Sequence, residues 1–208
     1  MNHKSLYSLF AGIILIMCVI PADVESAARR WSVTVCGPLP HPLRTAVAEA
    51  VDFWNGELTG LNVNLSLGPI AESNLQIPDT DLARISESVM RGERTVRFPQ
   101  VLKNISGDVL IILSGTDLIS VGFSRVNGRQ GLVILRRGDI PPLSLPNVAH
   151  NLVAHELGHV LGLSHNSDET KLMCGRPASC RPAAFQSTSK RFFPLTEKDR
   201  RDLIRRFK

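Results

Sequence analysis

The sequence has no hydrophobic run long enough to span a membrane. Its longest apolar stretch, LFAGIILIMCVI, has twelve residues at positions 9–20, whereas a membrane-spanning helix needs about 20. The chain also lacks internal repeats and low-complexity tracts, and 43% of its 208 residues are hydrophobic against 21% charged. These features disfavour a stable membrane anchor, a repeat array or a disordered chain, and they indicate one globular domain with a proper core.

Residues 1–28 have the pattern of a secretory signal peptide. A weakly basic start precedes the apolar run, and Ser26 and Ala28 are the small residues that suit cleavage after Ala28. A lipidated Cys18, as in bacterial lipoproteins, is disfavoured because Met17 stands where a small residue is expected. We therefore predict a mature chain of residues 29–208 that is secreted or periplasmic.

Cysteines are few, and their number in the mature chain is odd. Of the four in the sequence, Cys18 leaves with the signal peptide, and the other three enter an oxidising compartment where disulfides persist. Cys174 and Cys180 flank GRPAS and can close a small loop. Cys36 would then be the unpaired thiol, buried at the end of a strand. The other pairings stay open at this point.

Positive charge is in modest excess, and much of it lies at the end of the chain. The formal net charge is +5, and the segment 190–208 contains eight Lys or Arg residues against three Asp or Glu. That segment lacks the interleaved aromatic residues or glycines of a nucleic-acid-binding motif. A solvated helix face explains it better, so we expect no nucleic-acid partner.

Hydrophobic periodicity predicts an α+β fold. Strands are expected at 31–35, 61–67 and 108–113, with a hairpin at 119–137 around Asn127-Gly128. Helices are expected at 41–58, 79–90, 147–163 and 196–206. Pro42 suits the first turn of the first helix, Gly56 its end, and Thr196 the N-cap of the last. Residues 91–107 are expected to be a loop with a short extended piece.

The segment VAHELGHVLGLSH, residues 153–165, contains three histidines and a glutamate. On a helix, His155 and His159 lie about 40° apart around the axis and about 6 Å apart along it. Their imidazoles can therefore converge on one ion at about 2.0–2.1 Å, the distance that zinc prefers. Glu156 is rotated by about 100° from His155, which places its carboxylate beside the ion as a neighbour of a bound water.

The third histidine requires a turn, because one helix face cannot surround an ion. Gly162 tolerates positive φ and can end the helix, which brings His165 back toward the metal. Three imidazoles with an open fourth position are typical of a catalytic zinc site, whereas a structural site is closed by four protein ligands. The complete pattern HExxHxxGxxH, followed by Met173, is far more specific than HExxH alone.

These motifs resemble those of the metzincin metalloendopeptidases, and within them the matrixin (matrix-metalloproteinase-like) branch. The similarity includes HELGHVLGLSH, the eight-residue step to Met173 with Leu172 before it, and FPLTEKDRRDLI before the last helix. The resemblance implies a zincin fold over residues 29–208: a twisted, mostly parallel sheet with an antiparallel edge strand, an active-site helix and a C-terminal helix. It also implies that Met173 forms a hydrophobic floor beneath the metal.

Several residues depart from family patterns. Astacins and serralysins place a tyrosine two residues after the methionine, but here that residue is Gly175, and the single tyrosine is Tyr7. Matrixins usually have serine where Asn166 follows the third ligand. CGRPASC replaces the Tyr-Pro segment that walls their specificity pocket, so the resemblance does not predict the shape of this pocket. Cys36-Gly37 lacks the flanking Arg and Asp of the matrixin cysteine switch, which we therefore do not expect.

A single zinc ion is the expected cofactor. Only His41 and His150 remain in the mature chain beyond the three ligands, so the second, structural zinc of matrixins is not expected. We expect His150 to be a surface or packing residue and His41 to lie at a helix entry. A calcium site is compatible with the sequence, but no Asp-rich loop of suitable spacing supports one.

The resemblance implies hydrolysis of internal peptide bonds, with Glu156 as general base and the strand within 119–126 pairing with an extended substrate. Its partners would be protein or peptide substrates, a separate proteinaceous inhibitor is compatible with the sequence, and a monomer is expected. The alternative is an exported, non-catalytic zinc-binding or adhesion module on the same fold. The intact Glu156 separates the two, because zinc binding alone does not require it.

Overall fold

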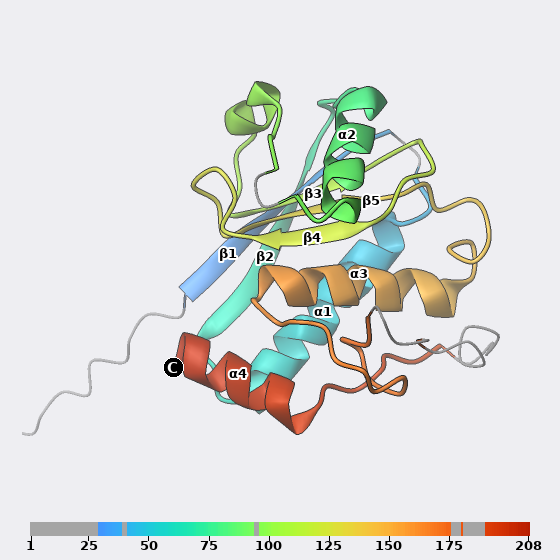
Figure 1. The fold of residues 1–208 in the computed structure, drawn as a ribbon. Coiled ribbons are helices and arrows are strands. Elements are labelled where there is room, and N and C mark those ends of the chain that lie inside the picture. The colour runs from blue at the N-terminus through green and yellow to red at the C-terminus, as the bar shows by residue number, and fades with distance from the viewer. Residues whose placement is uncertain (1–28, 39–40, 94–95, 176–179, 181–189) are drawn as a thin grey trace, which may run out of the picture.

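The centre of the fold is a five-stranded mixed sheet with helices on both faces (Figure 1). The computed structural model describes residues 29–208 except 39–40, 94–95, 176–179 and 181–189, so the predicted signal peptide lies outside the described residues. The strands are β1 (Arg29–Cys36), β2 (Leu65–Ser73), β3 (Val109–Leu113), β4 (Val121–Ser124) and β5 (Gly131–Leu135). The helices are α1 (Arg44–Gly60), α2 (Asp79–Met90), the 3-10 helix η1 (Gln100–Asn104), α3 (Pro146–Val160) and α4 (Glu197–Phe207). The predicted α+β class is confirmed.

The strand order is β2-β1-β3-β5-β4, and every neighbouring pair is parallel except β4 with β5. β4 is antiparallel because a tight turn joins it to β5. Asn127 and Gly128 supply this turn with φ values of 49° and 80°, the left-handed region that a two-residue hairpin turn requires. The result is an edge strand, β4, that lies directly above α3 in Figure 1.

The sheet is buried on both faces, and each face has its own hydrophobic cluster. Successive side chains of a strand point to opposite faces, and all five residues of β3 are buried. Val109, Ile111 and Leu113 face α1 and α3. Leu110 and Ile112 face α2. A strand buried on both faces reads as an uninterrupted apolar run, which is why DVLIIL was recognisable in the sequence.

Two predicted boundaries were wrong at the junction of α1 and β2. α1 continues past Gly56 to Gly60, and β2 begins at Leu65 instead of residue 61. A glycine inside a helix costs only about 1 kcal/mol, and the buried side chains of Trp54 and Leu58 on either side of Gly56 outweigh it. Residues 61–64 instead close the helix end, where Asn62 adopts φ 52°.

The 91–107 region also differs from the prediction, because it contains the 3-10 helix η1 instead of an extended piece. Pro99 precedes this helix with φ −56°, which favours a helical start. The guanidinium of Arg129 then donates hydrogen bonds to the carbonyl oxygens of Leu102, Ile105 and Gly107, and these stabilise the turn. Such a long-range contact leaves no local signal in the sequence.

α4 closes the lower side of the molecule in Figure 1. Its predicted N-cap, Thr196, is confirmed: the Thr196 hydroxyl accepts the N–H of Asp199 at 3.0 Å, and the Asp199 carboxylate accepts the N–H of Thr196 at 2.9 Å. This reciprocal capping box fixes the start of the helix. Among the described residues, no helix combines the length and the apolarity needed to cross a membrane.

Candidate metal centre

His155 and His159 lie on α3, and His165 follows the turn that ends this helix. Gly162 makes the turn with φ +91°, a conformation that glycine adopts at little cost. The N–H of Gly162 donates to the carbonyl of His159 at 3.0 Å, and the N–H of Leu163 donates to the carbonyl of Gly158 at 2.9 Å. The chain therefore reverses two residues after the helix end and carries His165 back over α3.

The three histidines converge through the same ring atom. The Nε2 atom of His165 lies 3.2 Å from Nε2 of His155 and 3.0 Å from Nε2 of His159. Two nitrogens bound tetrahedrally to zinc at about 2.0–2.1 Å would lie about 3.3 Å apart. The spacing of this triad therefore fits a zinc ion with little rearrangement.

Backbone carbonyls fix the tautomers of the two helical histidines. Nδ1 of His155 lies 2.8 Å from the carbonyl oxygen of Leu172, and Nδ1 of His159 lies 2.9 Å from that of Leu163. A carbonyl only accepts, so each Nδ1 carries the hydrogen and each Nε2 presents a lone pair. Hydrogen bonds of this kind orient metal-binding imidazoles in proteins. Burial lowers the pKa of His159 and of His165, which also favours the neutral, ligating form.

No further His, Cys, Asp or Glu of the described chain joins this group. Three neutral nitrogens thus face one point, and converging lone pairs repel unless a cation or a proton lies between them. Imidazole nitrogen is a preferred ligand of zinc, and a three-ligand set leaves one coordination position open for a water or a substrate. The donor set therefore fits a zinc ion of the catalytic type.

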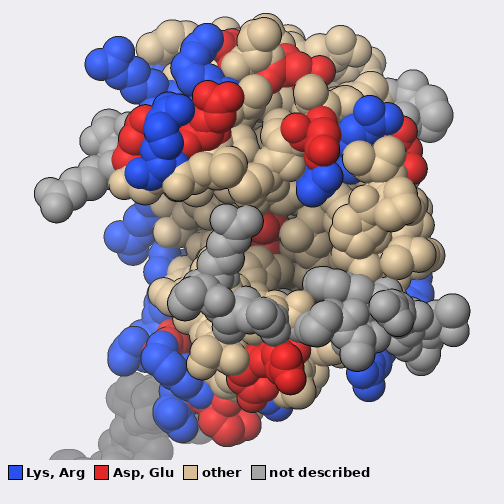
Figure 2. All heavy atoms as spheres, turned by 45° about the vertical axis from the view of Figure 1, so that its right-hand side comes forward, with Lys and Arg blue, Asp and Glu red and all other residues tan. Residues whose placement is uncertain are grey.

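Glu156 lies beside the triad on the same helix and is almost completely buried, with 6% of its surface exposed. Burial raises the pKa of its carboxyl to about 8, and a hydrogen bond from the backbone of Gly122 opposes this shift. A cation close by would favour the ionised form and lower this pKa. In the space-filling view of Figure 2, acidic atoms lie at the floor of a central hollow whose walls are mostly uncharged residues.

Gly122 is a site residue that the sequence analysis did not identify. A Cβ atom on Gly122 would lie 3.0 Å from the backbone carbon of Glu156 and 3.1 Å from Cβ of His159. The absence of a side chain therefore allows the edge strand β4 to contact α3 directly. A glycine inside a strand pattern is the signal that could have revealed it, because such a glycine often marks a close backbone approach.

Met173 is fully buried beneath α3. A Cβ atom on Gly158 would lie 3.0 Å from Cε of Met173 and 3.2 Å from the Trp54 ring, so the methionine packs directly on this glycine. The N–H of Asn166 donates to the carbonyl of Met173 at 2.8 Å. The segment that carries the third histidine and the segment that carries the methionine are thus joined backbone to backbone.

The residues after Met173 also support His165. A Cβ atom on Gly175 would lie 2.5 Å from Nδ1 of His165, so the imidazole lies flat against this glycine. Cys174 and Cys180 form a disulfide, with 5.7 Å between their Cα atoms. Cys36 is a free, buried thiol at the end of β1. Residues 176–179 of the CGRPASC segment lie outside the described part of the chain.

The other two histidines of the described residues lie away from the triad. His150 is buried on α3 with its ring 4.4 Å from that of Phe192, and its Nε2 lies 3.0 Å from the carbonyl oxygen of Arg191. His41 is buried just before α1, and its Nε2 lies 3.1 Å from the carbonyl oxygen of Ser114. Both hold neighbouring segments together.

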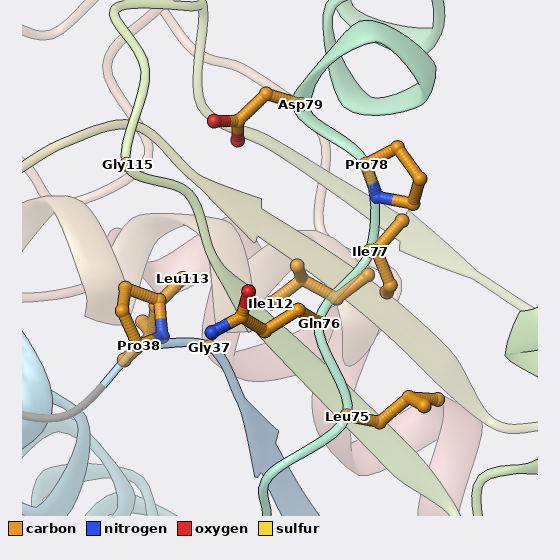
Figure 3. A pocket seen from close by; sticks show the side chains of 10 residues that line it. All are labelled: Gly37, Pro38, Leu75, Gln76, Ile77, Pro78, Asp79, Ile112, Leu113 and Gly115. Atoms are coloured by element: carbon orange, nitrogen blue, oxygen red, sulfur yellow. The ribbon is translucent and has the colours of Figure 1, made fainter.

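Two cavities differ in their relation to the triad. One, of about 620 Å³, reaches His159 and is lined by β4, by the turn after α3 and by the loop after α2. The other, of about 440 Å³, lies at the carboxyl ends of β1 and β3 (Figure 3). Its charged lining residue, Asp79, accepts a hydrogen bond from Ser114 at 2.9 Å, and no predicted site residue lines it.

No family model matches the chain, and no curated protein matches it. Among solved structures, the chain is similar to archaemetzincin from Methanopyrus kandleri, with a TM-score of 0.46 and 16% sequence identity. The match covers 87% of this chain and 96% of that one. A likeness of this extent does not assign the chain to a branch, and the matrixin branch has no support from these comparisons.

Proposed function

We propose that this protein is an exported zinc-dependent endopeptidase of the metzincin class, with motifs nearest to those of the matrixin branch. The observation that carries the proposal is the triad: the Nε2 atoms of His155 and His159 both lie within 3.2 Å of Nε2 of His165, and a buried glutamate lies on the same helix. Export follows from the signal-peptide pattern of residues 1–28. We propose that the protein acts as a monomer and that its substrates are proteins or peptides. A separate proteinaceous inhibitor would occupy the same cleft as the substrate.

His155, His159 and His165 would hold the ion. When bound there, zinc supplies Lewis-acid chemistry: it lowers the pKa of a bound water to about 7 and stabilises developing negative charge on a carbonyl oxygen. The carbonyls of Leu172 and Leu163 keep two of the imidazoles in the ligating tautomer. A calcium ion is not part of the proposal, because the part of the chain that the structure describes contains no further group of His, Cys, Asp and Glu side chains that could hold one.

Glu156 is the residue to which we assign the proton transfers. Its carboxylate takes a proton from the attacking water and later delivers it to the leaving amine, as a general base and then a general acid. Burial excludes bulk water from this carboxylate, and the backbone of Gly122 holds it in place.

The edge strand β4 is the element to which we assign substrate binding. It pairs with β5 on one side and stands at the end of the strand order. An extended peptide can add to such an edge through main-chain hydrogen bonds, which give affinity without demanding a particular sequence. Because Gly122 brings β4 against α3, a peptide on this edge would pass close to the triad.

The alternative is an exported, non-catalytic zinc-binding or adhesion module. The unusual CGRPASC segment after the methionine favours it. The buried carboxylate of Glu156 favours the peptidase, because burying an unneeded ionisable group costs free energy that a zinc-binding module could avoid with an apolar residue. The peptidase is therefore the function that the site supports best.

The test is a paired measurement on the mature protein: zinc per chain, and cleavage of unfolded casein with and without a chelator. We expect one zinc and chelator-sensitive cleavage. Glu156→Ala should keep the zinc and abolish cleavage, whereas His159→Ala should lose both. Glu87→Ala, an exposed glutamate of α2, is the matched control. Zinc without cleavage of any peptide would favour the binding module, and a folded chain without zinc would contradict both.

A further inference from the structure

The 620 Å³ cavity beside His159 has a mixed lining. Val89, Val96, Phe98 and Phe123 supply its apolar walls, and Ser124 and Ser164 add hydroxyl groups. Its charged lining residues are Glu93 and Arg206. Glu93 is already paired, because Nε of Arg91 lies 2.8 Å from its carboxylate. The charge that the cavity offers to a ligand is therefore the guanidinium of Arg206.

Arg206 contacts the turn that ends α3 at the metal centre. A Cβ atom on Gly162 would lie 2.5 Å from Cζ and 3.1 Å from Nε of Arg206, so the planar guanidinium lies against the glycine backbone. This contact joins α4 to the turn between the second and third histidines. The contact places the exposed Arg206 side chain at the cavity, where its Cζ also lies 5.7 Å from the centre of the Phe207 ring.

A second arginine, Arg125, does not line the cavity but lies close enough to Arg206 to interact with it electrostatically. Arg125 follows β4 and adopts φ 56°, a left-handed conformation that is uncommon for residues other than glycine. Desolvation, and then the proximity of Arg125, lowers the pKa of Arg206. Within the described part of the chain, no carboxylate forms an ion pair with either arginine. Two neighbouring cations without a counter-ion form a site for a negative charge.

The direction of β4 indicates which part of a substrate would meet these arginines. β4 and α3 run in the same direction (Figure 1). Gly122, near the start of β4, lies against Glu156. Gly131, which pairs with Ser124 at the end of β4, lies against Val160, further along α3. The strand therefore leads from the catalytic glutamate toward the cavity. A peptide paired antiparallel with β4, the slightly more stable arrangement, would place residues that precede the scissile bond there.

We propose that this cavity is a specificity site for an acidic side chain on the amino-terminal side of the scissile bond, with Arg206 as the principal recognition residue and Arg125 as its support. The proposal rests on the peptidase function proposed above and adds a substrate class to it. The methylene groups of a glutamate would contact Phe123 and its apolar neighbours, while the carboxylate would reach the guanidinium of Arg206.

The experiment uses quenched fluorescent peptides that differ only in carrying Glu, Gln or Lys, placed in turn at each of four positions on either side of the cleaved bond. We expect a Glu peptide to exceed its Gln counterpart in kcat/KM by roughly three- to tenfold at low ionic strength, the range of a partly exposed charge pair. The preference should weaken as salt is added. Arg206→Gln should reduce the Glu/Gln ratio to near one, Arg206→Glu should favour Lys, and Arg125→Gln should lower the ratio partially.

Arg205→Gln is the matched control, because Arg205 is the neighbouring arginine on α4, is 82% exposed and pairs with Asp202. It should leave the ratio unchanged. A second readout, the binding of the labelled Glu and Gln peptides to the Glu156→Ala variant, does not require hydrolysis. Acid-selective binding that depends on Arg206, without cleavage by the wild type, would support this site and contradict the peptidase. Cleavage with no acid preference, or with a preference only after the scissile bond, would overturn this site and leave the peptidase intact.

Discussion

Nδ1 of His155 lies 2.8 Å from the carbonyl oxygen of Leu172, the residue immediately before Met173. The methionine segment therefore orients His155, one of the proposed zinc ligands, through its backbone while its side chain packs on Gly158 from below. The N–H of Leu172 in turn donates to the carbonyl of Pro194 at 3.0 Å. Helix, methionine turn and the segment before α4 thus form one connected support for the metal centre.

This packing predicts opposite effects for the same substitution at two helical glycines. Gly158→Ala should destabilise the fold by about 1–3 kcal/mol, the cost of overpacking a core, because the new methyl group would meet Met173 and Trp54. Gly56→Ala should stabilise it by up to about 1 kcal/mol, because nothing lies within 4 Å of the added atom. Chemical denaturation of both variants measures the difference, and equal effects would contradict the described packing.

Gly122→Ala should reduce activity far more than stability. Its methyl group would meet the backbone of Glu156, which cannot rotate away as a side chain can, so β4 must move from α3. We expect kcat/KM to fall by about ten- to a hundredfold, since small misplacements of catalytic groups have effects of this size, while zinc content is retained. Gly56→Ala, which adds the same methyl group where nothing lies within 4 Å, is the control. A Gly122→Ala enzyme with full activity would show that β4 need not touch the helix.

Much of this architecture could be predicted from the sequence because its signals are local. Apolar periodicity located α2 at its observed bounds, and histidine spacing with Gly162 brought the triad together. Arg206 had no local signal, because its role depends on a contact with Gly162, which lies far from it in the chain. Gly122 had a local signal, a glycine inside a strand pattern, but its partner on α3 could not be predicted from the sequence. The boundary between α1 and β2 failed for a related reason: tertiary packing of Trp54 and Leu58 carries the helix past a local stop signal.

Removal of zinc should lower the stability of the whole fold. A ligand that binds only the native state stabilises it by about 2.7 kcal/mol when its concentration is a hundred times its Kd. Thermal unfolding with zinc and with chelator should therefore differ by several degrees. His165→Ala should abolish this difference, because the remaining two histidines cannot complete the site. An equal zinc-dependent shift in the variant would remove His165 from the ligand set.

The cysteines predict a simple labelling pattern in the mature chain. Cys36 is free and buried, and burial raises the pKa of its thiol. Its reaction with reagents is therefore slow for two reasons: the sulfur is inaccessible, and little of it is in the reactive thiolate form. Native protein should therefore take up no iodoacetamide, protein unfolded without reductant should be labelled at Cys36, and reduced unfolded protein should also be labelled at Cys174 and Cys180. Peptide mass spectrometry identifies each site. Labelling of Cys174 without reductant would contradict the disulfide.

His41 should make the protein less stable in mild acid. Its Nδ1 accepts the N–H of Leu43 at 3.2 Å and its Nε2 lies 3.1 Å from the carbonyl oxygen of Ser114, so the neutral ring is fully bonded. Protonation would turn Nδ1 into a donor that faces another donor. Burial, with a smaller contribution from Arg44, lowers the pKa of His41 below 6.5, although the Ser114 hydrogen bond and Asp139 oppose the shift.

Because the folded-state pKa is lowered, the unfolded chain binds more protons below about pH 6.5. The stability contributed by neutral His41 is therefore complete above that pH and is lost as the pH falls through the folded-state pKa. His41→Gln should be less stable than the wild type at pH 7, and its free energy of unfolding should depend less on pH between about 7 and 5. Urea denaturation of both chelator-treated proteins across this range measures the slopes. Parallel slopes would show that His41 titrates alike in both states.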